Sequence, residues 1–265
     1  MGLYETSRKF SGLCGTAMLD AAMAVLYPLD CGVCGAGAPS RRDGAACDDC
    51  WRQAEAVGAR YDRCAKCGLW MEKRGAGGNV PINAMDRECG LCREMAFTRA
   101  RSCGRYEGAL REVVLRLKVE PHLPVRLRAV AARCFRRMYE EQIVDSVIPV
   151  PLHAERIQAR GFNQADIIAR ALAADTGVYA DLFSLERAHE TGRHRAGMDR
   201  EARAKSMRAA FVVRAPRLVE GRAILLVDDT MTTGATAHEI AETLLAAGAR
   251  DVSVLTLTRA VSPWH

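Results

Sequence analysis

The most constraining feature of this 265-residue sequence is a set of four Cys-x-x-Cys pairs within its first hundred residues. The pairs are Cys31/Cys34, Cys47/Cys50, Cys64/Cys67 and Cys89/Cys92. A two-residue spacer lets both sulfurs of a pair bind one ion, and two pairs complete the four-thiolate tetrahedron of a closed structural zinc site. Four pairs outside a βαβ context are not typical of redox dithiols. We therefore expect these eight residues to hold two structural Zn²⁺ ions.

An internal repeat indicates how the four pairs combine. Only the first and third pairs are followed directly by glycine, Gly35 and Gly68, where a left-handed turn can aim backbone N–H groups at sulfur. Each half of the region therefore begins with the same kind of zinc knuckle. The repeat favours sequential pairing, first with second and third with fourth, over an interleaved cross-brace. Cys14, Cys103 and Cys134 are left over.

The hydrophobic pattern divides the chain into three parts. Residues 1–30 contain apolar side chains at helical spacing, which predicts an amphipathic helix over 13–27. Residues 31–95 hold the cysteine pairs with little apolar periodicity, as expected of a small domain in which metal replaces a core. In residues 103–262, helices are predicted over 124–140, 163–176 and 236–247, and strands over 145–150, 211–213, 223–227 and 252–257. Strands alternating with helices predict an α/β fold with a mostly parallel sheet flanked by helices.

Hydropathy and charge narrow the function classes. The longest apolar run, residues 21–29, is too short for a bilayer span, and no segment is typical of a secretory signal. We therefore expect a cytoplasmic protein without membrane insertion. Residues 99–137 contain eleven Lys and Arg against three Glu, an excess larger than the net charge of +6 for the whole chain. This basic segment is either a solvated helix surface or an electrostatic footprint for nucleic acid or a polyphosphate.

A strand that leads into two carboxylates carries the clearest chemical signal. The apolar residues 223–227 precede Asp228 and Asp229, a hydroxyl-rich turn with Gly234, and a helix that begins near Thr236. In parallel sheets ligands bind beyond the carboxyl ends of strands, and a turn that opens a helix directs N–H groups at a phosphate. Adjacent carboxylates suit sugar hydroxyls and a Mg²⁺ shell. Phosphate, diol and metal together describe a phosphorylated ribose.

These residues carry a family resemblance. Residues 225–236 resemble the phosphoribosyl-pyrophosphate (PRPP) signature of type I phosphoribosyltransferases, and the whole chain resembles the ComF/GntX family of competence proteins. Further matching stretches are residues 106–111, 115–118, 150–156 and 160–164. The resemblance implies a double zinc ribbon joined to a type I phosphoribosyltransferase-like domain. It also implies a role in natural competence, with PRPP as ligand, single-stranded DNA handled during uptake and a competence helicase beside it.

The resemblance also assigns residues to subsites. The PRPP-binding residues, with Mg²⁺, are Asp228, Asp229, Thr230, Met231, Thr232, Thr233, Gly234, Ala235 and Thr236. Among them, the two aspartates would bind the ribose hydroxyls and residues 232–236 the 5-phosphate. A loop over residues 152–161 takes the place of the pyrophosphate loop, with His153, Arg156, Arg160 and Gly161. Residues 191–208 correspond to the flexible loop that closes over PRPP.

Two functions are compatible with these features. The first is a Mg²⁺-dependent transferase that displaces pyrophosphate from PRPP by positioning and charge stabilisation, without a covalent nucleophile. The sequence identifies neither its acceptor nor a catalytic residue. The second is a non-catalytic protein that senses PRPP or acts as an adaptor for DNA or protein. Turnover of PRPP distinguishes the two.

Overall fold

The computed structural model describes residues 30–36, 39–40, 42–58, 61–72, 88–139, 143–188 and 210–260. The helix predicted over residues 13–27, the loop predicted over 191–208 and Cys14 all lie outside the described residues. The helices have these bounds: α2 Asp48–Val57, α3 Gly108–Leu117, α4 Val125–Tyr139, α5 Ala154–Arg160, α6 Gln164–Thr176 and α8 Ala235–Ala246, with 3-10 turns η2 Gly90–Cys92 and η3 Pro216–Leu218.

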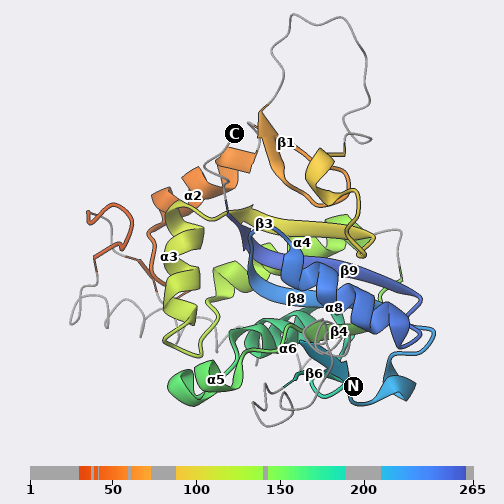
Figure 1. The fold of residues 1–265 in the computed structure, drawn as a ribbon. Helices are drawn as coiled ribbons and strands as arrows, with labels where there is room; N and C mark the ends of the chain where they lie inside the picture. The colour runs from red at the N-terminus through yellow and green to blue at the C-terminus, as the bar shows by residue number, and fades with distance from the viewer. Residues whose placement is uncertain are drawn as a thin grey trace, which may run out of the picture.

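A five-stranded parallel sheet forms the centre of the molecule (Figure 1). Its strands, in spatial order, are β3 Arg99–Arg105, β9 Asp251–Arg259, β8 Ala223–Met231, β4 Ser146–Pro149 and β5 Tyr179–Ala180. Two antiparallel pairs lie outside it: β1 Tyr61–Arg63 with β2 Trp70–Glu72, and β6 Leu185–Arg187 with β7 Phe211–Val213. The predicted α/β class with a parallel sheet and flanking helices is confirmed.

Side-chain alternation along β8 divides the hydrophobic core into two clusters. Leu225 and Val227 pack in one cluster with α3, α4 and α6, whereas Ile224 and Leu226 pack in the other with α8. Because successive strand residues point to opposite faces, each cluster lies on one face of the sheet. All residues from 223 to 227 are buried, as expected for a central strand of a parallel sheet covered on both faces.

The predicted elements agree closely with the structure, except at the end of β8. Helices α4 and α6 each begin one residue after their predicted starts. Strand β8, however, continues to Met231, four residues beyond its predicted end. The extension follows from the register with β9, in which Asp228 pairs with Thr256 and Thr230 with Thr258. The two carboxylates therefore lie within the strand rather than after it.

The cysteine region packs directly on the sheet and its helices. Helix α2 contacts α3, and the β1–β2 hairpin lies beside β3, where the N–H of Ala100 donates to the carbonyl of Lys66 at 2.7 Å. Cys31 belongs to the cluster with α3 and α4, whereas Cys64 belongs to the cluster with α8. The two halves of this region therefore share the cores on opposite faces of the sheet, and the boundary at residues 31–95 stays a prediction.

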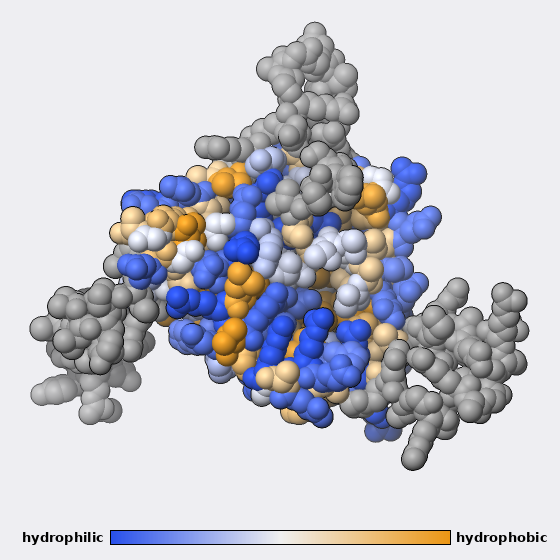
Figure 2. All heavy atoms as spheres, turned by 60° about the vertical axis from the view of Figure 1, so that its left-hand side comes forward, coloured by the Kyte–Doolittle hydropathy of each residue, from blue (hydrophilic) through white to orange (hydrophobic). Residues whose placement is uncertain are grey.

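In the described part of the chain, no helix is both long enough and apolar enough to cross a bilayer. On the face shown in Figure 2, hydrophilic side chains predominate and hydrophobic ones form small separate groups. The most exposed large hydrophobic residues, Leu91, Val119, Ile143 and Phe183, lie in different segments of the chain. Scattered exposure of this kind is ordinary for a protein surface.

The arginines of the basic segment separate into two groups. Arg126 on α4 lies 3.3 Å from Asp43 and 3.5 Å from Glu55, and it also contacts Asp48. Arg128 donates two hydrogen bonds to the carboxylate of Asp175, at 3.2 and 2.6 Å. These ion pairs fasten the cysteine region and α6 to α4, so both arginines have a structural use. A second group, Arg99, Arg101, Arg133 and Arg137, lines a groove.

We expect Arg126→Ala to lower the free energy of unfolding by about 1–2 kcal/mol, because it removes a partly buried charge from three carboxylates. Arg52→Ala is the matched control, since Arg52 also contacts Asp48 but is mostly exposed. Its effect should be clearly smaller, because solvent screens an ion pair between exposed side chains. Chemical denaturation followed by circular dichroism measures both variants, and equal effects would contradict the structural assignment of Arg126.

Candidate functional site

The eight paired cysteines form two tetrads, one of residues 31, 34, 47 and 50 and one of residues 64, 67, 89 and 92. Within each tetrad the Sγ atoms lie within 4.8 Å of one another. Sulfur–sulfur distances of 3.8 Å in the first tetrad and 3.4–3.5 Å in the second are close to the edge of a tetrahedron with Zn–S bonds of about 2.3 Å. The predicted sequential pairing is confirmed, and both tetrads are consistent with structural zinc sites.

Both tetrads begin with the same turn. Gly35 and Gly68 have φ angles of +69° and +67°, the left-handed backbone predicted for both knuckles. At Gly68 a Cβ atom would lie only 2.7 Å from the carbonyl oxygen of Ala100. Glycine therefore satisfies two requirements there, because it adopts the turn and lets the hairpin approach β3.

Backbone donors stabilise the first thiolate of each tetrad. The Sγ atom of Cys31 accepts the N–H groups of Val33 at 3.4 Å and Cys47 at 3.3 Å. The Sγ atom of Cys64 accepts the N–H groups of Cys67 at 3.4 Å and Cys89 at 3.2 Å. Burial tends to raise the pKa of Cys31, but the N–H donors outweigh it and hold this pKa at about 6. These sulfurs are therefore prepared to bind a metal ion as thiolates.

A buried arginine connects the second tetrad to β8. Arg259 on β9 is 3% exposed, and its guanidinium donates to the carbonyl of Cys67 at 2.8 Å and lies 3.7 Å from the Cys67 sulfur. The same guanidinium lies 3.0 Å from the sulfur of Met231. Its positive charge offsets the negative charge of a thiolate tetrad in the protein interior. Through Met231 this contact also reaches the turn that follows β8.

The two carboxylates of the predicted PRPP signature point to opposite faces of β8 because they are consecutive strand residues. Asp228 lines a small cavity of about 50 Å³ together with Thr232, Gly234 and Thr236. Asp229, which is 6% exposed, faces the other way, toward α3 and α6. Asp228, and not Asp229, therefore lines the same cavity as the hydroxyl-rich turn.

Asp229 joins three segments that are far apart in the sequence. Its Oδ2 atom lies 3.7 Å from the ammonium group of Lys118 and accepts a hydrogen bond from the amide of Gln164 at 3.3 Å. Arg160 in turn donates to the Gln164 oxygen at 3.1 Å. Lys118 and Gln164 were not among the predicted site residues. The one feature of the sequence that could have indicated them is that each is the last residue of a stretch that carries the family resemblance.

The environment of Asp228 favours its protonated form. Burial and, second, the negative charge of Asp229 raise the pKa of Asp228 to about 8. The backbone N–H of Asp229, which donates to Asp228 Oδ1 at 2.8 Å, opposes this shift only in part. A cation or a hydroxyl donor placed at this carboxylate would favour its ionised form. Asp228 is therefore suited to bind such a group.

The turn after β8 has the geometry of a phosphate cradle. Gly234 caps the N-terminus of α8 with φ +90°, a conformation that strains any residue with a side chain. The Thr233 hydroxyl accepts the N–H of Ala235 at 3.3 Å, which closes the turn. Residues 234–237, at the start of α8, line the same cavity, and the N–H groups of a helix's first turn have no acceptor within the helix. The helix begins at Ala235, one residue before the expected start.

The segment expected to form the pyrophosphate loop is helical, since residues 154–160 form α5. Its residues are mostly strong helix formers, and Gly161 ends the helix in a left-handed conformation with φ +79°. His153 is the N-cap residue, and Arg156 is exposed. Of the two predicted arginines, Arg160 alone contacts the site, through Gln164.

Comparisons with known proteins agree with this geometry. A family model described as a double zinc ribbon domain matches residues 22–84. The DNA utilization protein YhgH of Salmonella typhimurium is 30% identical over 218 residues, covering 78% of this chain and 88% of the relative. Competence protein F of Haemophilus influenzae is 25% identical over 225 residues, covering 81% and 90%.

A solved phosphoribosyltransferase structure from Corynebacterium diphtheriae is 20% identical to this chain, with a TM-score of 0.33. The match covers 59% of this chain and 71% of that protein. The two cysteine tetrads and the parallel sheet define a double zinc-ribbon region packed on an α/β domain. The chain belongs to the ComF family, that of competence protein F and the DNA utilization protein YhgH.

We expect two zinc ions per chain in protein purified without added metal, measured by elemental analysis. Cys31→Ser should lose one ion and unfold more easily, because metal binding at a buried thiolate site contributes directly to folding. Cys103→Ser is the control, because Cys103 belongs to neither tetrad and should leave both ions bound. A Cys31→Ser protein that keeps two zinc ions would contradict the assignment of the first tetrad.

Proposed function

We propose that this protein binds PRPP with Mg²⁺ at the carboxyl end of β8. We also propose that this binding supports DNA utilization, the process after which its relatives are named. The observation that carries the proposal is the juxtaposition of Asp228 with a phosphate-sized cavity at the N-terminus of α8. The ribose hydroxyls would contact the Asp228 carboxylate, which also suits a Mg²⁺ ion. Asp229 would act from the opposite face, by fixing Lys118 and Gln164.

The turn supplies the groups that the 5-phosphate requires. Thr232 and Thr236 line the cavity with Asp228, and Gly234 forms the left-handed turn beside it, where a Cβ atom would lie 2.7 Å from the methyl group of Met231. Thr230, Met231, Thr233 and Ala235 complete the signature around them. The positive end of the α8 dipole adds to the attraction for an anion.

The pyrophosphate would lie between β8 and the start of α5. Strand β4 pairs with β8, and the N–H of Val150 donates to the carbonyl of Val227 at 2.9 Å, so the chain that leads to His153 begins beside Asp228. Arg160 and Lys118 add positive charge to this edge of the site through their contacts with Gln164 and Asp229. Arg156 and Gly161 belong to the same segment. One guanidinium group can donate to two phosphate oxygens at once, and this bidentate geometry suits a leaving pyrophosphate.

Such a site performs transfer by positioning. PRPP loses pyrophosphate through an oxocarbenium-like state, so the protein needs to hold phosphate, ribose and pyrophosphate in line and stabilise the leaving charge. The second candidate is a protein that binds PRPP without turnover and acts as an adaptor for DNA or for a helicase. Its support is the family name, together with the positive charge of the segment from residue 99 to 137. Pyrophosphate release from PRPP, screened against bases, nucleotides and oligonucleotides, distinguishes the transferase from the adaptor.

We expect the double variant Asp228→Asn/Asp229→Asn to bind PRPP with Mg²⁺ at least about tenfold more weakly, because charge-assisted hydrogen bonds contribute about 1.5–3 kcal/mol each. Isothermal titration calorimetry measures the affinity. Asp251→Asn, at the opposite end of the same sheet, is the control and should bind as the wild type does. Unchanged affinity in the double variant would overturn the proposed site.

We also expect PRPP binding to release protons. With the pKa of Asp228 raised to about 8, its carboxyl is mostly protonated at pH 7, whereas the ligand would bind the ionised form. Binding at pH 7 should therefore release up to about one proton, and affinity should rise with pH until about 8 and then level off. Calorimetry in two buffers of different ionisation enthalpy measures this release. Asp228→Asn should lose it, and equal proton release by both proteins would exclude the titration of Asp228.

A further inference from the structure

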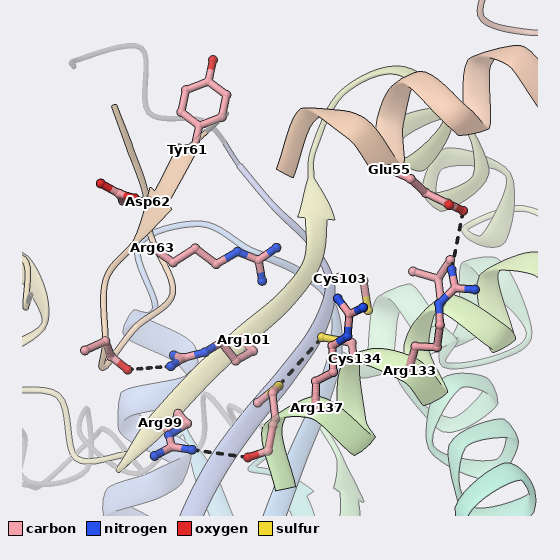
Figure 3. Close-up of a pocket in the computed structure, with 13 residues that line it drawn as sticks. Glu55, Tyr61, Asp62, Arg63, Arg99, Arg101, Cys103, Arg133, Cys134 and Arg137 are labelled. Carbon is pink, nitrogen blue, oxygen red and sulfur yellow. Dashed lines mark hydrogen bonds and ion pairs between the residues drawn. The ribbon is translucent and has the colours of Figure 1, made fainter. Parts of the chain in front are cut away.

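A groove lined by five arginines lies at the β3 edge of the sheet (Figure 3). Its volume is about 1020 Å³. The arginines come from three elements: Arg63 from β1, Arg99 and Arg101 from β3, and Arg133 and Arg137 from α4. This groove contains the second group of arginines from the basic segment together with Arg63 of the cysteine region.

The backbone geometry explains why these arginines converge. On β3, alternation places Arg99 and Arg101 on the same face, away from the buried face of that strand. On α4, Arg133 and Arg137 are four residues apart and therefore project from the same side of the helix. Figure 3 shows Arg63 extending from β1 toward this space, whereas the carboxylate of the preceding residue in the same strand points away.

The groove has more positive charge than its carboxylates neutralise. Two acidic residues, Glu55 and Asp62, line the groove with the five arginines, and the Asp62 carboxylate points away from it. Arg133 lies 3.6 Å from Glu55, but Glu55 also contacts Arg126 at 3.5 Å. Within the described ranges, ion pairs with a carboxylate are absent for Arg63, Arg99, Arg101 and Arg137. The residues that line the groove therefore have more positive than negative charge, five arginines against two acidic side chains.

Neutral groups hold the arginines in place instead. Arg101 donates to the backbone carbonyl of Ala65 at 2.9 Å, and Arg99 donates to that of Met138 at 3.3 Å. Arg63 lies over the ring of Trp70, 3.9 Å from its centroid. Burial lowers the pKa of Arg101, and the charges of Arg99 and Arg63 lower it further. The guanidinium groups are thus oriented by the fold while their mutual repulsion stays uncompensated, which an anion would relieve.

This groove is separate from the proposed PRPP site. Strand β9 lies between β3, which contains Arg99 and Arg101, and β8, which contains Asp228. The residues that line the groove and those that line the cavity beside Asp228 have no member in common. A ligand could therefore occupy either place without the other.

We propose that the arginine groove is a second anion site, which binds several phosphates of one ligand, supplied by a nucleic-acid strand or by a polyphosphorylated nucleotide. Arginine is the side chain whose planar fork matches phosphate oxygens. Five such groups spread over three elements exceed what a single phosphate can contact, and the volume is at the upper end of small-molecule sites. The contacts go to phosphates, so base identity should matter little.

Two thiols in the groove provide a built-in probe of its occupancy. Cys103 and Cys134 face the same space as the arginines (Figure 3). A hydrogen bond from Cys103 lowers the pKa of Cys134, and the charge of Arg63 adds to this effect although burial opposes it. A thiol with a lowered pKa reacts more readily with alkylating reagents. A bound polyanion should shield Cys134 from such a reagent.

The test uses the full-length, zinc-loaded protein and the double variant Arg101→Glu/Arg137→Glu. Single-stranded oligothymidine and inorganic tripolyphosphate are the two probes, followed by fluorescence anisotropy and by calorimetry. We expect the variant to bind each probe that the wild type binds at least about tenfold more weakly. Its affinity for the single strand should also depend less on salt, because each lost phosphate contact reduces the slope of log affinity against log salt concentration by about 0.7. Binding of oligothymidine alone identifies a strand as the ligand, and binding of both probes identifies phosphate as the shared determinant.

Arg170→Glu/Arg217→Glu is the matched control, because it changes the net charge equally at two exposed positions outside the groove. Zinc content and circular dichroism establish that each variant is folded. Saturating probe should also slow the alkylation of Cys134 in the wild type, mapped by mass spectrometry. The groove variant should keep its PRPP affinity, and Asp228→Asn/Asp229→Asn should bind the probes normally, which separates this site from the proposed function.

Three results would overturn the proposal. The first is a folded groove variant that binds both probes with the affinity and salt slope of the wild type. The second is an equal loss of affinity in the control variant, which would assign the effect to net charge alone. The third is a wild type that binds neither probe at low salt.

Discussion

The structure depends on the burial of two thiolate tetrads against opposite faces of one sheet. A buried thiolate is costly unless a metal ion and hydrogen-bond donors offset its charge, so each tetrad requires both. The first tetrad shares a hydrophobic cluster with α3 and α4. The second shares one with α8 and with Ile224 and Leu226 of β8. Metal binding in this chain is therefore coupled to the packing of the α/β domain itself.

The second tetrad has a further consequence for the site at the end of β8. Arg259 lies between the sulfur of Cys67 and that of Met231, and the methyl group of Met231 is the nearest neighbour of a Cβ placed on Gly234. Phe97, which is fully buried, packs in the same cluster. The cysteine region thus packs, through Arg259 and Met231, against the turn proposed to bind a phosphate. A zinc ribbon can in this way stabilise a ligand site without contacting the ligand.

Positive charge in this protein has two different uses, and the segment of residues 99–137 contributes to both. Arg126 and Arg128 are neutralised by carboxylates and hold α4 to its neighbours. Arg101 and Arg137 have no such partners among the described residues, and they share a groove with an arginine from the cysteine region. The difference is set by where the carboxylates of other segments lie. It places the uncompensated charge at the sheet edge, away from Asp228.

The sequence by itself determined the features that depend on local spacing. Two-residue spacers and glycines at 35 and 68 predicted the sequential tetrads, and alternating periodicity predicted the parallel α/β fold. Only the tertiary structure decided that β8 continues past residue 227, because that length depends on pairing with β9. It also decided that Asp229 meets Lys118 and Gln164 and which arginines remain unpaired. These outcomes rest on contacts between segments far apart in the chain, and local periodicity contains no information about them.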